Sequence, residues 1–445
     1  MAGGSGGVWQ AGPMDYRSGG LAADLTFRHL IHQVTDPALP GLLDEGPMTL
    51  YTGFDPSAPS LHVGNLLQIC TLRRFQQAGH APIALAGGAT GMIGDPGGKT
   101  HERSLLSPEE LEANLSAMRR QLSGFLDLDD TPGPGRACLL DNAAWLARMS
   151  VVDFLRQVGK HFTVNQMMAK ESVRSRLERP DQGISFTEFS YMLLQAYDFF
   201  RLSTDHGCRL QVGGSDQWGN ITLGVELIRR STRVEAFGLT TPLVTKPDGT
   251  KFGKTESGTV WLDGSMTSPY RLYQFLLQSE DAVVGEYLRY FTFLTHEEII
   301  DLDGQTTTHP EHRAAQRALA RAVCTLVHGS EATAAAERAS AALFGSEIAA
   351  IDERTLLDVF QGAPSFPVPR DELDGSGVLL ADMMVTAGLA RSKGDARRTI
   401  AQGGAYVNNV RQRDGDRLIG IGDLLHGRYL VLRRGRRDHC LVRAE

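Results

Sequence analysis

The sequence predicts an α/β fold: a doubly wound parallel sheet, followed by a helical domain and a small α+β domain. Three observations predict it. The chain has 445 residues, 42% of them hydrophobic, which is too long for one ordinary domain and apolar enough to bury two or three cores. Its first part follows a strand–helix–strand order, which is typical of parallel sheets. Residues 376–445 hold 13 Lys and Arg against 7 Asp and Glu, although the net charge of the chain is −7. We therefore expect a basic end that contacts a polyanion.

Composition divides the chain into five expected parts. They are a flexible tail (1–24), the doubly wound domain with an inserted connective region (25–245), a helical domain that starts with a glycine-rich loop (246–362), a linker (363–377) and the basic domain (378–445). The five cysteines form no C-x-x-C pair, which favours a reducing, cytoplasmic setting over a disulfide framework or a zinc site. No apolar run reaches about 18 residues, so no membrane span is expected, and the N-terminus lacks the pattern of a secretory signal.

The first βαβ unit begins with a strand over residues 48–54. A loop with Pro56 leads into a helix over residues 61–77, which Gly79 ends. Residues 81–86 (APIALA) are nearly all apolar, as expected for a strand covered on both faces of a parallel sheet. This order predicts a Rossmann-like unit whose ligands bind at the carboxyl ends of the strands.

Later elements follow from their start and stop signals. Capping boxes at residues 107–110 and 185–188 predict helices that run to about Phe125 and Arg201. The remaining expected elements are an apolar stretch (137–140), a strand (208–212), a helix that ends at Arg229 and Arg230, a polar glycine-rich loop (245–258) and a run of helices (268–345).

The start of the 61–77 helix is a candidate anion site. A helix N-terminus offers free N–H groups and the positive end of the helix dipole to a phosphate. His62 adds a donor, Gly64 lets a ligand approach the backbone, and Asn65 lies one turn after Leu61. The alternative is a solvent-facing histidine beside a chance asparagine, which this motif alone does not exclude.

Two glycine-rich loops hold lysines that suit phosphate groups. The chain has 38 arginines and only seven lysines, yet four of these (Lys99, Lys246, Lys251 and Lys254) lie in the two loops. Residues 251–255 (KFGKT) place two lysines three apart beside a hydroxyl, which favours a polyphosphate; the alternative is a solvated basic turn. Residues 94–100 (GDPGGKT) can wrap an anion but are one residue short of a Walker A motif, which disfavours a P-loop NTPase.

One face of the predicted helix over residues 187–200 carries a phenol, an amide and a carboxylate. Tyr191, Gln195 and Asp198 lie at i, i+4 and i+7, so they share a face. A polar stripe of this kind is costly to bury unless it meets a polar ligand. The alternative is a solvated polar face.

Taken together and in order, these pieces resemble the class I aminoacyl-tRNA synthetases, and among them the bacterial tyrosyl-tRNA synthetases. Residues 61–65 (LHVGN) are similar to the HIGH motif and residues 251–255 to the KMSKS loop, with departures at Asn65, at Phe252–Gly253 and at Thr255. Further similar blocks are YTGFDP (51–56), GGATGMIGDP (87–96), YMLLQAYD (191–198) and QVGGSDQWGN (211–220). Residues 392–398 (SKGDARR) and 402–408 (QGGAYVN) resemble the RNA-binding domain of a small-subunit ribosomal protein.

The resemblance implies a reaction and a set of partners. L-tyrosine and ATP would form tyrosyl-adenylate and pyrophosphate, and the tyrosyl group would then pass to the 3′ end of tRNA(Tyr). Mg²⁺ would accompany ATP, no tightly bound metal is implied, and a homodimer is expected. Such a transfer needs positioning and charge stabilisation rather than a protein nucleophile.

The resemblance also implies roles for individual residues. For tyrosine it implies Tyr51 and Asp198 at the phenol, with Asp95, Tyr191, Gln195 and Gln211 elsewhere in the site. For ATP it implies Gly53, Asp55, Gly64, Asp216, Gln217 and Lys254. For catalysis and the departing pyrophosphate it implies Ser57, His62, Asn65, Lys99, Arg103, Lys251, Lys254 and Thr255. For RNA it implies Lys393, Arg397 and Arg398.

Two rival interpretations remain at this point. A tryptophanyl relative would share the core, but its substrate has no phenol, so a pairing of Tyr51 with Asp198 would be unexplained. A non-catalytic RNA-binding protein on the same fold would be expected to lose the histidine and the lysines of the two motifs, which this chain keeps.

Overall fold

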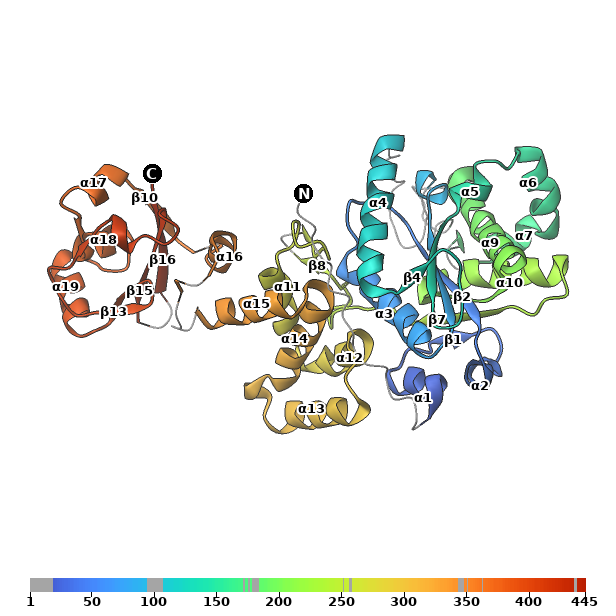
Figure 1. The fold of residues 1–445 in the computed structure, drawn as a ribbon, viewed down its shortest axis with the longest axis horizontal. Helices are drawn as coiled ribbons and strands as arrows, with labels where there is room; N and C mark the ends of the chain where they lie inside the picture. The colour runs from blue at the N-terminus through green and yellow to red at the C-terminus, as the bar shows by residue number, and fades with distance from the viewer. Residues whose placement is uncertain are drawn as a thin grey trace. The chain divides into compact units, whose positions relative to one another are not determined.

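The computed structural model describes residues 19–93, 107–170, 173–174, 177, 184–250, 252–255, 258–342, 348–349, 351–361, 363–435 and 438–445. The chain divides into two compact units (Figure 1). The first comprises the described residues up to Met266 together with Ser279–Val327, and the second comprises Thr267–Gln278 and His328–Glu445. No helix among the described residues is long and apolar enough to cross a membrane.

The first unit is built on a seven-stranded sheet with the order β1-β7-β6-β2-β3-β5-β4. Its strands are β1 (Gln33–Val34), β2 (Thr49–Phe54), β3 (Ala81–Ala86), β4 (Leu128–Asp129), β5 (Ala137–Asp141), β6 (Cys208–Gly214) and β7 (Phe237–Thr241). Only β1 is antiparallel to its neighbour within this sheet. The sheet grows from β2 to β3 on one side and through β6 to β7 on the other, which confirms the doubly wound fold. Ligands of such folds bind at this switch point.

Helices lie on both sides of this sheet (Figure 1). They are α1 (Gly20–Phe27), α2 (Leu39–Glu45), α3 (Val63–Gln77), α4 (Pro108–Phe125), α5 (Ala143–Leu146), α6 (Val151–Gln157), α7 (Val164–Met168), α9 (Phe186–His206) and α10 (Trp218–Ser231). Both predicted capping residues cap their helices, since the Ser107 and Ser185 hydroxyls accept the backbone N–H of Glu110 and Glu188 at 3.2 Å. The α9 helix runs to His206, past the expected end near Arg201, because Leu202 is fully buried and Gly207 ends the helix with φ of 63°.

The helical stretch after residue 258 is shared between the two units. Helices α12 (Asp281–Phe291), α13 (His296–Thr308) and nearly all of α14 (Ala314–His328) belong to the first unit. Helices α11 (Pro269–Leu277), α15 (Ser330–Ala342) and α16 (Glu353–Val359) belong to the second. The division therefore runs through the stretch that the sequence analysis treated as one helical domain.

The end of the chain is a small α+β fold around a five-stranded sheet with the order β10-β16-β15-β12-β13. Its elements are β10 (Ser365–Val368), α17 (Arg370–Asp374), β11 (Val378–Leu379), α18 (Leu380–Thr386), α19 (Lys393–Ala401), β12 (Ala405–Val407), β13 (Val410–Gln412), β14 (Leu418–Ile419), β15 (Tyr429–Arg434) and β16 (Asp438–Ala444).

The stretch 363–377 differs from the expected linker because it contains β10 and α17. Strand β10 pairs in parallel with β16 at the edge of the sheet. Phe366 and Val368 pack on the core of this fold, while Pro367 between them is exposed. Proline lacks a donor and is tolerated at an edge strand, so a sequence that resembles a linker is in part a strand here.

Candidate active site

Polar side chains gather at the carboxyl ends of the parallel strands. Asp55 follows β2, Asn142 follows β5, and α9 brings Asp198 beside them. This is the switch point of the sheet, where the sequence analysis expected a ligand.

Asp198 lies at the bottom of this group, with 3% of its surface exposed. Its two carboxylate oxygens accept hydrogen bonds from Asn142 Nδ2 at 3.0 Å and from Trp145 Nε1 at 2.7 Å. Asn142 is held in turn, since its Oδ1 accepts the N–H of Ala89 at 2.8 Å and its Nδ2 donates to Thr90 Oγ1 at 2.9 Å. The carboxylate is therefore fixed in place, and the alternative of a solvated helix face is wrong for Asp198.

Tyr51 is buried close to Asp198, and its hydroxyl has no hydrogen-bond partner among the described residues. The Tyr51 ring lies 5.3 Å from that of Phe199, between centroids. The Oε1 atom of Gln211, on the neighbouring strand β6, is also buried without a partner there. An unsatisfied buried polar group costs about 1–3 kcal/mol, so a ligand with polar groups of its own would supply the partners that these two atoms lack.

Burial raises the pKa of both Asp198 and Tyr51. It raises the pKa of Asp198 to about 7, although the hydrogen bonds from Asn142 and Trp145 act to lower it, and the charges of Asp141 and Asp55 raise it further. Burial, and then the charge of Asp198, also raises the pKa of Tyr51 well above its ordinary value. The Tyr51 hydroxyl thus keeps its proton, and the Asp198 carboxyl changes charge near neutral pH.

Tyr191 and Gln195 lie on the same face of α9, two turns and one turn before Asp198 respectively. The buried Tyr191 hydroxyl lies 3.4 Å from Asp55 Oδ1, and Gln195 Oε1 accepts a hydrogen bond from Asn220 Nδ2 at 3.0 Å. A Cβ on Gly87 would lie 2.9 Å from Asp55 Oδ1. The Asp55 carboxylate therefore links Tyr191 on α9 to the end of β2.

Other residues expected at ATP, together with Ser57 from the expected catalytic set, lie in or after these strands. Gly53 is exposed in β2, and a Cβ there would meet nothing within 4 Å. Ser57 is exposed just after Asp55, and its N–H donates to the Asp55 carbonyl oxygen at 2.8 Å. Asp216 and Gln217 lie in a 3₁₀ turn between β6 and α10, where Gln217 Oε1 accepts the amide of Asn220 at 3.1 Å. The open backbone at Gly53, the half-buried Asp55 and the exposed Asp216 can bind a nucleotide.

The α3 N-terminus is built as a cap around His62. Asn65 Oδ1 accepts the His62 backbone N–H at 3.0 Å. The Asn65 Nδ2 group is therefore the part of this side chain that can donate a hydrogen bond to a ligand. A Cβ on Gly64 would lie 2.7 Å from His62 Cε1, so the imidazole lies directly over the Gly64 backbone. Asn65 therefore supports the helix start that presents His62.

The loop with Lys254 lies against this helix start. The N–H of Val63 donates to the Val260 carbonyl oxygen at 3.0 Å, and His62 forms an antiparallel bridge with Trp261. Lys254 is exposed in β8 (Lys254–Thr255), which pairs with β9 (Gly258–Thr259). The two motifs are almost 190 residues apart in sequence, and the fold brings them together.

Four of the expected site residues lie outside the described residues: Asp95, Lys99, Arg103 and Lys251. The backbone of Thr255 is described as part of β8. The other residues expected for tyrosine, ATP and catalysis lie around the switch point and the α3 N-terminus.

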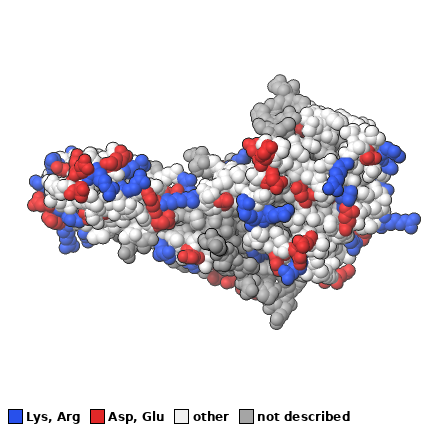
Figure 2. Space-filling view, turned by 45° about the horizontal axis from the view of Figure 1, so that its top comes forward, with Lys and Arg blue, Asp and Glu red and all other residues white. Residues whose placement is uncertain are grey.

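The three expected RNA-binding residues lie on α19 in the second unit. Lys393, Arg397 and Arg398 expose 69%, 58% and 73% of their side chains, and acidic neighbours lie 2.9–4.0 Å away. Figure 2 shows that cations and anions alternate on the visible face of this unit. Exposed ion pairs are weak, so the side chains can exchange these partners for phosphates.

Sequence reasoning missed Asn142 and Trp145. A signal existed for Asn142, because Asp141 and Asn142 directly follow the apolar stretch 137–140, where a parallel strand would end. Trp145 carries no such signal. Its role depends on Asp198, which is 53 residues later in the chain.

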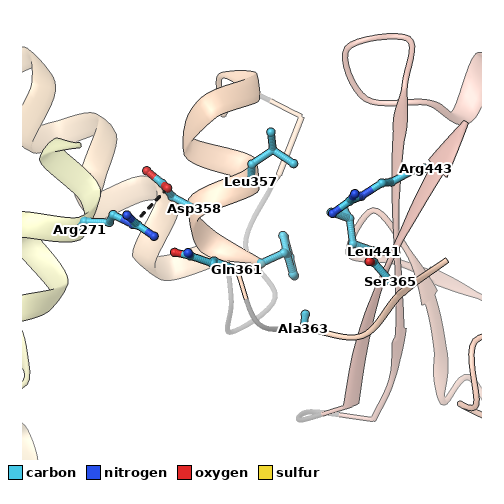
Figure 3. Close-up of a pocket in the computed structure, with 9 residues that line it drawn as sticks. Arg271, Leu357, Asp358, Gln361, Ala363, Ser365, Leu441 and Arg443 are labelled. Atoms are coloured by element: carbon cyan, nitrogen blue, oxygen red, sulfur yellow. Dashed lines mark ion pairs between the residues drawn. The ribbon is translucent and has the colours of Figure 1, made fainter. Parts of the chain in front are cut away.

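The second unit has a pocket of its own, of about 330 Å³, between α16 and the sheet of the α+β fold (Figure 3). Arg271 forms an ion pair with Asp358 at 3.2 Å on one side, and Ser365, Leu441 and Arg443 line the other. None of the expected site residues lines it. The pocket is therefore separate from the candidate active site.

Comparisons with known proteins agree with this geometry. Residues 43–345 match the family described as tRNA synthetases class I (W and Y), and residues 357–442 match the tyrosine–tRNA ligase SYY-like C-terminal domain. The tyrosine–tRNA ligase of Roseiflexus castenholzii is 56% identical over 94% of this chain and 98% of its own length. That of Geobacillus stearothermophilus is 52% identical, over 95% and 99%.

Solved structures give the same picture for the first part of the chain. A C-terminally truncated mitochondrial tyrosyl-tRNA synthetase of Aspergillus nidulans is 32% identical with a TM-score of 0.65, and it covers 74% of this chain and 96% of its own. The tyrosyl-tRNA synthetase of Archaeoglobus fulgidus, solved in complex with L-tyrosine, shares the fold at 19% identity, 70% and 99% coverage and a TM-score of 0.52. The first family match covers both tryptophan and tyrosine enzymes, but the C-terminal match and the relatives are specific to tyrosine. The chain therefore belongs to the tyrosine–tRNA ligase family of class I tRNA synthetases.

Proposed function

We propose that the chain joins L-tyrosine to tRNA(Tyr) in two steps in the cytoplasm. In the first, the carboxylate of tyrosine attacks the α-phosphate of MgATP, forming tyrosyl-adenylate and releasing pyrophosphate. In the second, the terminal ribose hydroxyl of the tRNA takes the tyrosyl group and AMP leaves. The observation that carries the proposal is the buried pair of Asp198 and Tyr51, where a fixed carboxylate and an unpaired hydroxyl share one pocket.

The tyrosine end of the site follows from donor and acceptor chemistry. The substrate phenol donates its proton to Asp198, and the Tyr51 hydroxyl donates to the phenol oxygen. Tyr191, Gln195 and Asp95 hold the substrate ammonium group, and the unpaired Oε1 of Gln211 accepts a further hydrogen bond. The Tyr51 hydroxyl and Gln211 Oε1, which have no partner among the described residues, then gain one when tyrosine is bound.

The ATP end uses backbone and carboxylates. Gly53 and Gly64 let the nucleotide approach the chain, Asp55, Asp216 and Gln217 contact its sugar and adenylate, and the α3 N-terminus faces the phosphates. Mg²⁺ enters with ATP and neutralises phosphate charge.

Negative charge develops on pyrophosphate as it leaves. The cations and hydrogen-bond donors that the family resemblance assigns to this step would stabilise it. These residues are Ser57, His62, Asn65, Lys99, Arg103, Lys251, Lys254 and Thr255. No protein nucleophile is needed for this step, because positioning and charge stabilisation suffice.

The basic end serves tRNA. Lys393, Arg397 and Arg398 extend from one exposed helix, and an RNA backbone can displace their acidic neighbours. We propose the division of labour that the sequence suggested: adenylate chemistry in 25–245 with the loop that follows, and tRNA binding in 378–445.

A second copy of this chain is the expected partner of the first unit. Half of the fourteen large hydrophobic side chains that are exposed in the described structure fall within residues 151–186. They are Val151, Val152, Leu155, Val164, Met168, Leu177 and Phe186. An apolar surface of this kind is typical of a protein interface, and sedimentation velocity at micromolar concentration should find a dimer.

Charging of tRNA(Tyr) tests the proposed function. With ATP and Mg²⁺ present, radiolabelled tyrosine should become esterified to the 3′ end of a tRNA(Tyr) transcript. Tryptophan attached instead would favour the tryptophanyl interpretation, and tRNA binding without attachment of any amino acid would favour the non-catalytic one.

A further inference from the structure

We call the loop that carries Lys254, described here over residues 252–255, the lysine loop. It is anchored at Phe252, two residues before Lys254. Phe252 exposes only 7% of its surface. Its ring stacks on Phe291 with 5.1 Å between centroids and 17° between planes, and lies 4.7 Å from the ring of Tyr287. We call these three rings the anchor cluster. Such packing is worth more than the buried area alone, so the loop has a fixed attachment point on α12.

The α12 helix is itself tied to α3, the helix whose N-terminus presents His62. The Sγ–H group of Cys70 on α3 donates to the Phe291 carbonyl oxygen at 3.7 Å. Arg74, also on α3 and fully buried, donates to the carbonyl oxygens of Arg289 and Thr292. The anchor cluster therefore has a fixed position relative to α3.

Gly253 packs the lysine loop against the N-terminus of α3. Its φ is +85°, and a Cβ there would lie 2.4 Å from Val63 Cγ2, so the loop backbone lies directly on the first turn of α3. Its carbonyl oxygen accepts the N–H of Val260 at 2.9 Å. Lys254 is the next residue. The position of its backbone is therefore fixed by the packing of Phe252 and by the contact of Gly253 with Val63.

We propose that Phe252 is a positioning residue for the activation step: its ring, held by Tyr287 and Phe291, places Lys254 at the α3 N-terminus. The inference depends on the proposed role of Lys254 in stabilising pyrophosphate. A lysine side chain has four rotatable bonds, and its ammonium group acts at a defined point only if its backbone is fixed. Loss of the ring should displace Lys254 without changing the tyrosine pocket.

A double-mutant cycle tests this inference. Phe252→Leu and Lys254→Ala are made singly and together. For each variant, kcat and the KM values for ATP and for tyrosine are measured for adenylate formation. Misplacement of a catalytic group by about 1 Å can cost about a hundredfold in rate, so Phe252→Leu should lower kcat by roughly tenfold to a hundredfold. Its KM for tyrosine should stay within about twofold. In the Lys254→Ala background the same change should lower kcat by no more than about twofold, since residues that act through one another are not additive.

Tyr290→Leu is the matched control. Tyr290 is buried and packs edge-on against Phe291, with 6.2 Å between centroids, so its loss damages the same helix on another side. It should lower the melting temperature about as much as Phe252→Leu does while kcat stays near wild type. If Phe252→Leu proves too unstable to purify, Phe252→Met takes its place in the cycle.

The outcomes separate the two proposals. If Lys254→Ala leaves kcat unchanged, the proposed role of Lys254 is wrong, and the positioning role falls with it. If Lys254→Ala lowers kcat but the effect of Phe252→Leu is fully multiplicative, absent, or matched by Tyr290→Leu, only the positioning inference is overturned.

Discussion

At the scale of single residues, we propose that the choice of amino acid depends on Asp198. Phenylalanine has nearly the same size as tyrosine, so apolar contact does not separate them. Its binding would leave the Tyr51 hydroxyl without a partner and would give Asp198 no donor from the ligand. A hydrogen bond to a charged group is worth about 1.5–3 kcal/mol, against about 0.5–1.5 kcal/mol for one to a neutral group. We therefore expect Asp198→Ala to reduce the preference for tyrosine over phenylalanine more than Tyr51→Phe does, with about a tenfold loss for Tyr51→Phe.

The measurement is kcat/KM for both amino acids in both variants. Asp205→Ala is the control, because Asp205 lies on the same helix and pairs with Arg201 on the surface at 2.6 Å. An unchanged ratio in Asp198→Ala would mean that Asp198 supports Asn142 and Trp145 but does not select the amino acid.

The raised pKa of Asp198 predicts a pH dependence of tyrosine binding. The phenol needs an ionised acceptor, and in the empty pocket that carboxyl loses its proton only near pH 7. Binding therefore favours the deprotonated form and tightens as pH rises through about 7. Equilibrium dialysis should show about tenfold tighter binding at pH 8 than at pH 6.

Asp198→Asn should bind tyrosine more weakly and with almost no change between these pH values. A wild-type affinity that is flat from pH 6 to 8 would mean that Asp198 is already ionised, or is not the acceptor.

At the scale of elements, the first turn of α3 and the lysine loop form one structure. Gly253→Ala adds a methyl group that would overlap Val63 and also strains a φ of +85°. Gly249→Ala is the control, since Gly249 has a similar φ of +79° but nothing within 4 Å of an added Cβ. We expect Gly253→Ala to lower kcat for adenylate formation by at least about tenfold and Gly249→Ala to leave it nearly unchanged.

Rates from rapid quench for the two variants decide this. Equal losses in both would assign the effect to backbone strain rather than to contact with α3.

Local signals predicted the elements well, and long-range contacts explain what they missed. The serine caps and apolar runs placed β3, α4 and the start of α9 because these depend on neighbours in sequence. The end of α9 was misplaced because Leu202 is buried by tertiary packing.

The same reason explains two larger misses. Ser365–Val368 looked like a linker because the partner strand β16 comes some seventy residues later. Asn142 and Trp145 were not identified because their partner, Asp198, lies more than fifty residues away. The motifs at 61–65, 191–198 and 251–255 could be recognised in the sequence because each keeps its residue types at short spacing.

At the scale of the molecule, the proposal assigns adenylate chemistry and RNA binding to different parts of the chain. Arg397→Ala combined with Arg398→Ala should raise KM for tRNA(Tyr) and weaken the salt dependence of binding, because fewer phosphate contacts release fewer counterions. Pyrophosphate exchange should stay at the wild-type rate. Substitution is preferable to truncation near residue 370, which would leave β10 without β16.

Charging assays at several salt concentrations check this. Arg119→Ala with Arg120→Ala, two exposed arginines of α4 in the first unit, serves as the control. Unchanged KM and salt dependence in the α19 variant would remove the RNA role from that helix.

ATP–pyrophosphate exchange with each amino acid in turn tests the central claim most directly, because it reports the adenylate step without tRNA. The account predicts Mg²⁺-dependent exchange with tyrosine, and little with phenylalanine or tryptophan. Exchange driven by tryptophan, or none with any amino acid, would contradict it.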